Sequence, residues 1–257
     1  MLTDPQPVSS EQRRENAREI ADLLLQHYGD DLLALGVYGS LARGTDGPFS
    51  DIEMHCIIRG EQFETSFEWS TGAWKAEVDV YSPDVILARA AEVDGEWSIT
   101  HGQFTGVWVL HDPTGLFPRL EKLALSQPAG RFEQAMAEVI VGDIYELIGK
   151  LRNAQVRQQA ECLPFYLVLL AQYAACLVGL ANRRTYATSA TLFSDSLQLP
   201  DRPPGYDALC QAVMRGELNN PLQAMRWAED LWQGILTWAA QRRLPITTSL
   251  ADLLAQE

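Results

Sequence analysis

The sequence predicts an α+β fold with two domains, one that mixes helices with strands and one that is helical. Short apolar or alternating runs, which are typical of strands, occur in the first half of the chain. Beyond about residue 128, apolar residues recur instead over long stretches at helical spacing. A chain of 257 residues is long enough for one large domain or for two ordinary ones.

The first domain is expected to begin with a helix. Residues 9–12, Ser-Ser-Glu-Gln, resemble a capping box, and Ile20, Leu24 and Tyr28 follow at helical spacing. Residues 29–31, Gly-Asp-Asp, end that helix. The elements expected next are a buried strand at 33–38, a strand at 52–58, an alternating strand at 74–81, and a helix at 83–93 that starts with proline.

The second domain is expected to consist of long helices at 132–152, 164–183 and 221–241. The sequence Gln-Pro-Ala-Gly at 127–130 separates the two patterns, so the predicted domains are residues 1–127 and residues 128–257. The most apolar stretch, 165–180, is too short to span a bilayer and includes Gln172, which indicates a buried helix.

The composition excludes several classes of partner. The chain has 34 acidic and 20 basic residues and a formal net charge of −14, so neither a nucleic acid nor an anionic membrane is expected as its partner. Its four cysteines form no C-x-x-C pair, which favours reduced thiols over a zinc site or disulfides. Because its start lacks the pattern of a signal peptide, we expect a cytoplasmic protein.

The segment 36–54 combines a glycine turn with carboxylates. A strand runs into Gly39 and Ser40, a polar loop follows, and the next strand opens with Asp51 and Glu53. Without a Cβ at Gly39 the backbone can approach a phosphate closely, and the Ser40 hydroxyl adds a donor. Arg43 can pair with the same phosphates through its planar guanidinium. This half of the pattern predicts a phosphate-binding turn.

The carboxylates indicate a metal site. Positions 51 and 53 of a strand face the same side, and two carboxylates on one side repel each other unless a cation lies between them. Mg²⁺ takes one or two carboxylates together with phosphate oxygens. If the strand at 74–81 pairs beside them, Glu77 or Asp79 completes a triad for one or two metals, and the spacing leaves open which of the two it is.

This pattern resembles the signature of the polymerase-beta-like nucleotidyltransferase superfamily, and most closely its aminoglycoside 4'-O-nucleotidyltransferases, the kanamycin nucleotidyltransferases. The resemblance covers nearly the whole chain, except for the first ten and the last fifteen residues. The motifs that carry it are Gly36-Val37-Tyr38-Gly39-Ser40, the run from Thr45 to Met54, Thr100-His101-Gly102-Gln103-Phe104, Gly149-Lys150-Leu151-Arg152-Asn153 and Pro204-Gly205-Tyr206-Asp207.

The resemblance implies a polymerase-beta-like N-terminal domain, a mixed sheet with flanking helices, and a C-terminal helical bundle. It implies that an aminoglycoside 4'-hydroxyl attacks the α-phosphorus of ATP or another nucleoside triphosphate, which leaves a nucleoside monophosphate on the drug and releases pyrophosphate. Drugs such as kanamycin, tobramycin and amikacin are the expected acceptors, and resistance is the expected consequence. The family also implies one or two Mg²⁺ ions and a homodimer whose active sites are shared between subunits.

The resemblance also implies roles by position. Asp51, Glu53 and Glu77 are implied as metal ligands, which selects Glu77 over Asp79. Glu146 is implied as the general base and Lys150 as the group that stabilises the transition state; their i, i+4 spacing places them on one face of a helix. The implied nucleotide-binding residues are Gly39, Ser40, Arg43, Lys150 and Thr188, and the implied drug-binding residues are Glu68, Lys75, Glu77, Asp143 and Glu146.

One departure and two alternatives remain. Better-known members of the family have two consecutive acids where this chain has Gly142 and Asp143, which leaves the drug range open but does not affect the phosphoryl chemistry. The first alternative is a nucleotidyltransferase of the same superfamily with another acceptor. The second is a catalytically inactive nucleotide-binding or antitoxin-like module, against which the complete set Asp51, Glu53, Glu77 and Glu146 argues.

Overall fold

The structure is a computed structural model that describes residues 4–254, and it confirms the predicted α+β class. Its contacts divide the chain into two compact units. The first, here called the sheet unit, comprises the chain up to Glu92 together with Thr100–Gln127, and the second, the helical unit, comprises Val93–Ile99 and the chain from Pro128 onward. Residues 1–3 and 255–257, the outer ends of the two predicted domains, lie outside the described residues.

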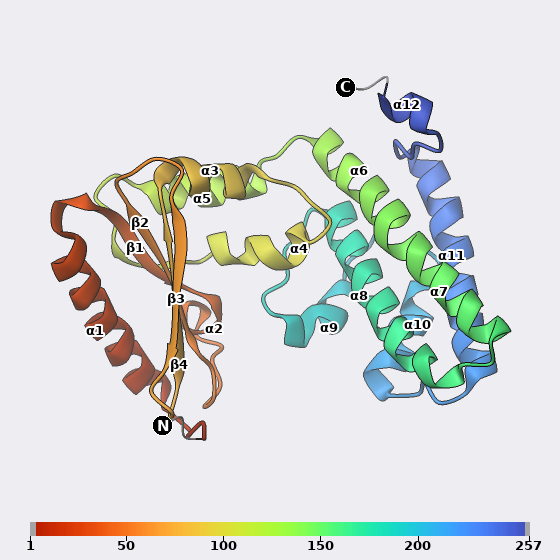
Figure 1. Ribbon diagram of the computed structural model, residues 1–257, viewed down its shortest axis with the longest axis horizontal. Helices are drawn as coiled ribbons and strands as arrows, with labels where there is room; N and C mark the ends of the chain where they lie inside the picture. Colours follow the sequence, from red (N-terminus) through yellow and green to blue (C-terminus); the bar gives the residue numbers. More distant parts are fainter. Residues whose placement is uncertain (1–3, 255–257) are drawn as a thin grey trace. The chain divides into compact units, whose positions relative to one another are not determined.

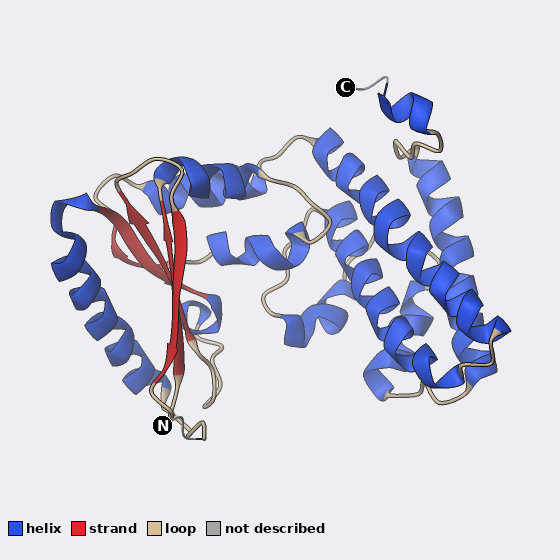
Figure 2. Ribbon diagram, viewed as in Figure 1, coloured by secondary structure: helices blue, strands red, loops and turns tan. Residues whose placement is uncertain are grey.

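The sheet unit is built on one five-stranded mixed sheet with the order β3-β4-β2-β1-β5 (Figure 2). Strands β2 and β4 are parallel, and the other neighbouring pairs are antiparallel. Among the described residues no strand follows β5. The strand bounds are Leu32–Tyr38 for β1, Ile52–Ile58 for β2, Glu64–Ser70 for β3, Lys75–Tyr81 for β4 and Trp108–His111 for β5.

Helices cover both faces of this sheet (Figure 1). Helix α1, Ser10–Tyr28, packs Ala17 and Ile20 against the apolar side chains of β1, β2 and β4 on one face. Helices α3, Pro83–Ala91, and α5, Leu116–Leu125, cover the other face. The N-cap bond of the predicted capping box is present, because the Ser9 hydroxyl accepts a hydrogen bond from the Gln12 backbone N–H at 3.1 Å, while the Gln12 side chain donates to Asn16 at 3.2 Å.

Strand β3 is an element that the sequence did not predict. It lies at the edge of the sheet, where most of its side chains are exposed on both faces. The burial of a central strand is what produces an alternating or continuous apolar pattern, so Glu-Thr-Ser-Phe-Glu-Trp-Ser carries little of that signal. The turn after β1 also differs from expectation, because Gly39 opens a short helix, α2, that runs from Gly39 to Arg43.

The helical unit contains the long helices expected for the second domain. The stretch predicted as one helix at 132–152 forms α6, Ala129–Glu138, a π-helical segment at Val139–Ile144, and α7, Tyr145–Val156. Gly142 and Asp143 lie in that π-helical segment. The remaining helices are α8 at Leu163–Asn182, α9 at Leu192–Ser196, α10 at Tyr206–Arg215, α11 at Pro221–Arg242 and α12 at Leu250–Leu254.

Residues Val93–Ile99 pack with the helical unit, although the prediction includes them in the domain at 1–127. The reason is the first part of the short helix α4, Trp97–Thr100. The Trp97 side chain is fully buried and meets the Phe132 ring edge-on at 4.8 Å between centroids. The Ser98 hydroxyl donates to the Cys176 carbonyl at 3.0 Å. A segment held by a buried tryptophan belongs to the core that buries it, whatever its position along the chain.

Helix α8 is the central helix of this unit. By length and composition the stretch Ala160–Asn182 could cross a membrane, with a mean hydropathy of 1.9 over its most apolar window. Of that window 61% is buried inside the structure, and the buried side chains of α8 belong to the main apolar core of the helical unit. The burial matches the prediction of a core helix.

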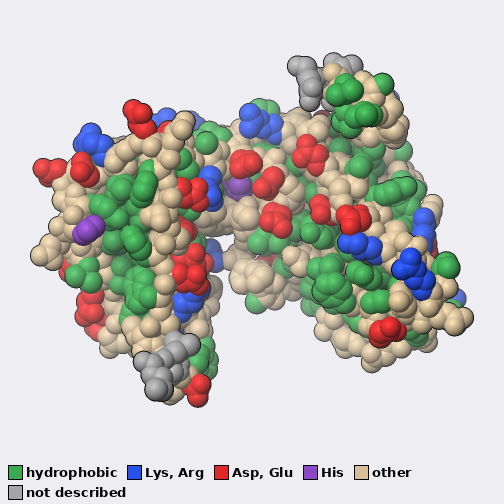
Figure 3. All heavy atoms as spheres, viewed as in Figure 1, with side chains coloured by type: hydrophobic (Ala, Val, Ile, Leu, Met, Phe, Trp, Pro, Cys, Tyr) green, Lys and Arg blue, Asp and Glu red, His purple; other side chains and the backbone are tan. Residues whose placement is uncertain are grey.

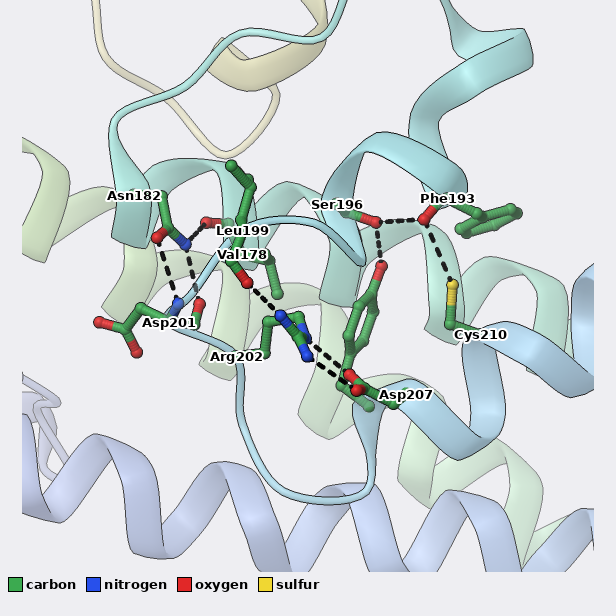
Figure 4. Close-up of polar contacts among 10 residues, drawn as sticks. Val178, Asn182, Phe193, Ser196, Leu199, Asp201, Arg202, Asp207 and Cys210 are labelled. Atoms are coloured by element: carbon green, nitrogen blue, oxygen red, sulfur yellow. Dashed lines mark hydrogen bonds and ion pairs between the residues drawn. The ribbon is translucent and has the colours of Figure 1, made fainter.

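A polar network holds the segment that joins α9 to α10, within the helical unit (Figure 4). The Asn182 amide donates to the Asp201 carbonyl at 2.8 Å, and the Asp201 N–H donates back to the Asn182 side chain at 3.2 Å. The Arg202 guanidinium makes two bonds to the Asp207 carboxylate, at 2.7 and 2.8 Å. The motif at 204–207 that supported the family resemblance therefore includes Asp207, which helps to hold the connection between α9 and α10.

Candidate active site

The register of the sheet places a row of polar side chains across four strands. Tyr38 at the end of β1 pairs with Glu53 on β2, Glu53 pairs with Glu77 on β4, and Glu77 pairs with Glu68 on β3. Directly paired residues project to the same face of a sheet. Three carboxylates from three strands therefore lie side by side. The spacing left Glu77 and Asp79 open, and the register puts Glu77 beside Glu53 and Asp79 beside His55.

Gly39 lies against this row. It follows β1 directly and has a φ of 74°, in the left-handed region that favours glycine. A Cβ at this position would lie 1.9 Å from Oε2 of Glu53, far inside van der Waals contact. Only glycine therefore allows the turn to approach the Glu53 carboxylate this closely. Ser40 follows in α2, and Arg43 ends that helix.

The Glu53 carboxylate lies in a perturbed electrostatic environment. Its pKa is raised to about 7, mainly by burial and also by the charge of Asp51, while Arg43 opposes the shift. Glu77 also acts to raise the pKa of Glu53. Burial lowers the pKa of Arg43, and the charge of Glu53 opposes that shift. The cluster thus holds more negative charge than its own cations neutralise, which favours binding of an added cation.

The donor set fits Mg²⁺ in company with a nucleotide. Among the side chains that the structure describes, no three from His, Cys, Asp or Glu converge closely enough to hold a metal by themselves. Mg²⁺ does not require such a cage, because it takes one or two carboxylates and completes its shell with phosphate oxygens and water. The hard carboxylate oxygens of Asp51, Glu53 and Glu77, the last two on directly paired positions, are of the kind that this ion prefers.

A lysine lies among the acids at the β3–β4 end of the row. The Lys75 ammonium is 2.7 Å from Oε1 of Glu68 and 3.7 Å from Oε2 of Glu77. The hydrogen bond to Glu68 is the main reason that the pKa of Lys75 is raised. All three side chains remain partly exposed, so these ion pairs contribute little to stability and leave the groups accessible to a ligand.

The helical unit contributes a second group of predicted site residues. Glu146 lies in the first turn of α7, and the Lys150 ammonium is 2.6 Å from its Oε1. Asp143 lies in the π-helical segment before that helix, and Tyr173 of α8 donates a hydrogen bond to its carboxylate. Burial raises the pKa of Asp143, a shift that Tyr173 opposes and Glu146 reinforces. π-Helical turns occur frequently at functional sites.

Thr188 belongs to the helical unit as well. It caps a short helical turn, Ser189–Thr191, and its hydroxyl accepts from the Ala190 N–H at 3.3 Å. The structure thus groups the predicted site residues within each unit. The sheet unit holds Gly39, Ser40, Arg43, Asp51, Glu53, Glu68, Lys75 and Glu77, and the helical unit holds Asp143, Glu146, Lys150 and Thr188.

The sequence analysis named Asp79 only as an alternative to Glu77, and it assigned no role to the Tyr38 and Ser66 side chains on the same face. Tyr38 donates to Asp79 at 2.9 Å, and Ser66 of β3 donates to Glu77 at 3.5 Å. The alternation of β4 places Asp79 on the face of Glu77, which was a signal for its presence. Nothing in the local sequence shows that Tyr38, two strands away, reaches it.

Comparisons with known proteins agree with the motifs. The family model of the KNTase C-terminal domain matches residues 114–245. Two curated relatives, aminoglycoside nucleotidyltransferases (4') from a Bacillus species and from Staphylococcus aureus, are each 40% identical over 237 residues, which is 92% of this chain and 94% of the relative.

A solved structure supports the fold. The crystal structure of a nucleotidyltransferase-like protein from Exiguobacterium sibiricum is similar with a TM-score of 0.55, over 89% of this chain and 77% of that one, at 12% identity. At that identity the likeness concerns the fold alone. The identity to the two curated relatives extends over nearly all of this chain and confirms the resemblance that the motifs carried. The chain belongs to the aminoglycoside nucleotidyltransferase (4') family.

Proposed function

We propose that this protein is a Mg²⁺-dependent aminoglycoside O-nucleotidyltransferase of the cytoplasm. It transfers a nucleoside monophosphate from ATP or another nucleoside triphosphate to the 4'-hydroxyl of drugs such as kanamycin, tobramycin and amikacin, releases pyrophosphate and confers resistance. The observation that carries the proposal is the row of Glu53 and Glu77 beneath the Gly39 turn, in a chain whose curated relatives are named for this chemistry.

The sheet unit binds the triphosphate. The Gly39 backbone lets the nucleotide approach, and the Ser40 hydroxyl and the Arg43 guanidinium donate to the β- and γ-phosphates. Lys150 and Thr188 are further phosphate donors, and Lys150 acts on the triphosphate of the partner subunit. Asp51, Glu53 and Glu77 hold one or two Mg²⁺ ions. When bound, Mg²⁺ polarises the α-phosphate and neutralises the charge that develops on the departing pyrophosphate.

The helical unit supplies the base. Glu146 takes the proton of the 4'-hydroxyl while the sugar oxygen forms a bond to the α-phosphorus and the bond from that phosphorus to the bridging oxygen breaks. A general base of this kind contributes about 10²- to 10⁴-fold. The Lys150 ammonium, 2.6 Å from Glu146, donates to the non-bridging oxygens. The protein acts as a homodimer in which Glu146 and Lys150 serve the triphosphate of the partner.

The acidic surface attracts the drug. Aminoglycosides carry several ammonium groups, and a net charge of −14 raises their local concentration and association rate. On the face drawn in Figure 3, Asp and Glu side chains are spread over both units. Glu68 and Glu77 of the sheet unit and Asp143 of the helical unit pair with drug ammonium groups, and Lys75 orients the first two. Gly142 offers no carboxylate, so the drug has one fewer partner there.

The test is a mass spectrum of tobramycin or kanamycin after incubation with the protein, ATP and Mg²⁺. The expected product is a nucleoside monophosphate adduct of the drug, formed together with pyrophosphate. Gentamicin, which lacks the 4'-hydroxyl, should give no adduct, and the Asp51→Asn variant should give none with any drug. The absence of an adduct with every triphosphate, from folded wild-type protein, would reject the proposal.

A further inference from the structure

We propose that Tyr38 and Asp79 are positioning residues, whose hydrogen bond across β2 holds the Gly39 turn and the Glu53 carboxylate in the geometry that binds the metal and nucleotide. This inference rests on the proposed function, since it concerns the same site. Neither residue is among the metal, nucleotide or drug ligands that the family resemblance implies, and the structure brings them together from strands that are not neighbours.

The bond spans an entire strand. Tyr38 is the last residue of β1, Asp79 lies on β4, and β2 runs between them. The Tyr38 hydroxyl donates to Oδ2 of Asp79 at 2.9 Å. To reach it, the phenol ring lies over the His55 imidazole of β2, with centroids 4.1 Å apart and planes 19° from parallel. Tyr38 is only 9% exposed, so water competes little for this bond.

The ring beneath the bond is itself held firmly. His55 is fully buried, and its Nε2 lies 3.3 Å from the Gln103 carbonyl. A carbonyl only accepts, so Nε2 carries the proton and the imidazole has a fixed orientation. Phe104 stacks at 5.8 Å between its centroid and that of His55. Tyr38 therefore rests on a buried, stacked ring, and its hydroxyl donates to Asp79.

The site residues are attached directly to the two ends of this bond. Gly39 follows Tyr38 in the chain, and Glu77 precedes Asp79 by two residues on the same face of β4. Glu53 lies between them, paired with Tyr38 on one side and with Glu77 on the other. The space between Gly39 and the Glu53 carboxylate does not admit a Cβ, so a small shift of the β1 end changes this contact.

The decisive variant is Tyr38→Phe, which keeps the stacked ring and removes the hydroxyl. The probe is Mn²⁺ with ATP, in the absence of any drug, followed by electron paramagnetic resonance, so that the readout does not depend on turnover. Loss of a hydrogen bond to a carboxylate predicts roughly tenfold weaker Mn²⁺ binding. Because the variant keeps the packing of β1, β2 and β4, the midpoint of its urea unfolding transition should change little. Kinetics should show a higher KM for the nucleotide and a lower kcat.

Two further variants separate positioning from general stability. Asp79→Asn keeps an oxygen that accepts from Tyr38 and should lose less Mn²⁺ affinity than Tyr38→Phe; the double variant should bind no more weakly than Tyr38→Phe alone. The matched control is Tyr81→Phe, which also removes the hydroxyl of a buried tyrosine on the same face of the sheet. The Tyr81 ring lies 5.3 Å from the Arg89 guanidinium. It should bind Mn²⁺ as the wild type does.

The outcomes distinguish this inference from the proposed function. Mn²⁺ binding by Tyr38→Phe within twofold of wild type, or an equal loss in Tyr81→Phe, would overturn the positioning role. Failure of the wild type to bind Mn²⁺ with ATP would overturn it as well, since there would be no site to position. If the wild type binds Mn²⁺ and ATP but modifies no aminoglycoside, the proposed function fails while the Tyr38→Phe comparison still decides the inference.

Discussion

Substitution of Gly39 by alanine tests the close approach on which the site depends. Two costs follow from the structure. A φ of 74° costs an L-residue about 1–2 kcal/mol. The added Cβ would lie 1.9 Å from Oε2 of Glu53, whereas ordinary contact begins at 3.4 Å, so the carboxylate must move by 3.4 − 1.9 = 1.5 Å. A misplacement of about 1 Å in an active site can cost about 10²-fold in rate.

Gly44→Ala is the matched control for this prediction. Gly44 has a φ of 68°, so alanine meets the same backbone cost there, but nothing lies within 4 Å of the added Cβ. Both variants should lose about 1–2 kcal/mol in the free energy of unfolding measured by urea titration. In a pyrophosphate-release assay with tobramycin, only Gly39→Ala should fall by about 10²-fold. A rate for Gly39→Ala within a factor of three of that for Gly44→Ala would refute this reasoning.

Three further predictions concern stability, pH and the base. Arg13 and Asp46 form an ion pair with side chains 1% and 2% exposed, so Arg13→Ala should lower the free energy of unfolding by about 3–5 kcal/mol in urea; a loss below 1 kcal/mol would contradict a buried pair. The pKa of Glu53 is raised from 4.5 to about 7. Between pH 4.5 and about pH 7, the folded protein without metal therefore binds one proton that the unfolded chain has lost. Its unfolding free energy should therefore fall as pH rises through this window, and Glu53→Gln should remove most of that fall in melting curves. Glu146→Gln should reduce turnover by about 10²-fold or more and leave calorimetric nucleotide binding nearly intact; near-normal turnover would exclude Glu146 as the base.

Local patterns in the sequence determined the elements that carry most of the site. The capping box predicted where α1 begins, and an apolar run predicted β2 with its observed bounds, residues 52–58. The spacing of Glu146 and Lys150 predicted a shared helix face, which the ion pair at 2.6 Å confirms. These features depend on residues within a few positions of each other, so periodicity and capping chemistry suffice to predict them.

Strand pairing decided what the sequence left open. The parallel register of β2 with β4 put Glu77, not Asp79, beside Glu53, and a shift of one residue would have turned those side chains to the other face. Edge strand β3 and the attachment of Val93–Ile99 to the helical unit likewise depend on burial against distant partners. The contact of Gly39 with Glu53 joins the end of β1 to its neighbour β2. The bond from Tyr38 to Asp79 joins β1 to β4, the next strand beyond β2. The sequence by itself determined which chemical groups this protein has, and only tertiary packing decided which of them meet, because pairing energies arise between residues that are far apart along the chain.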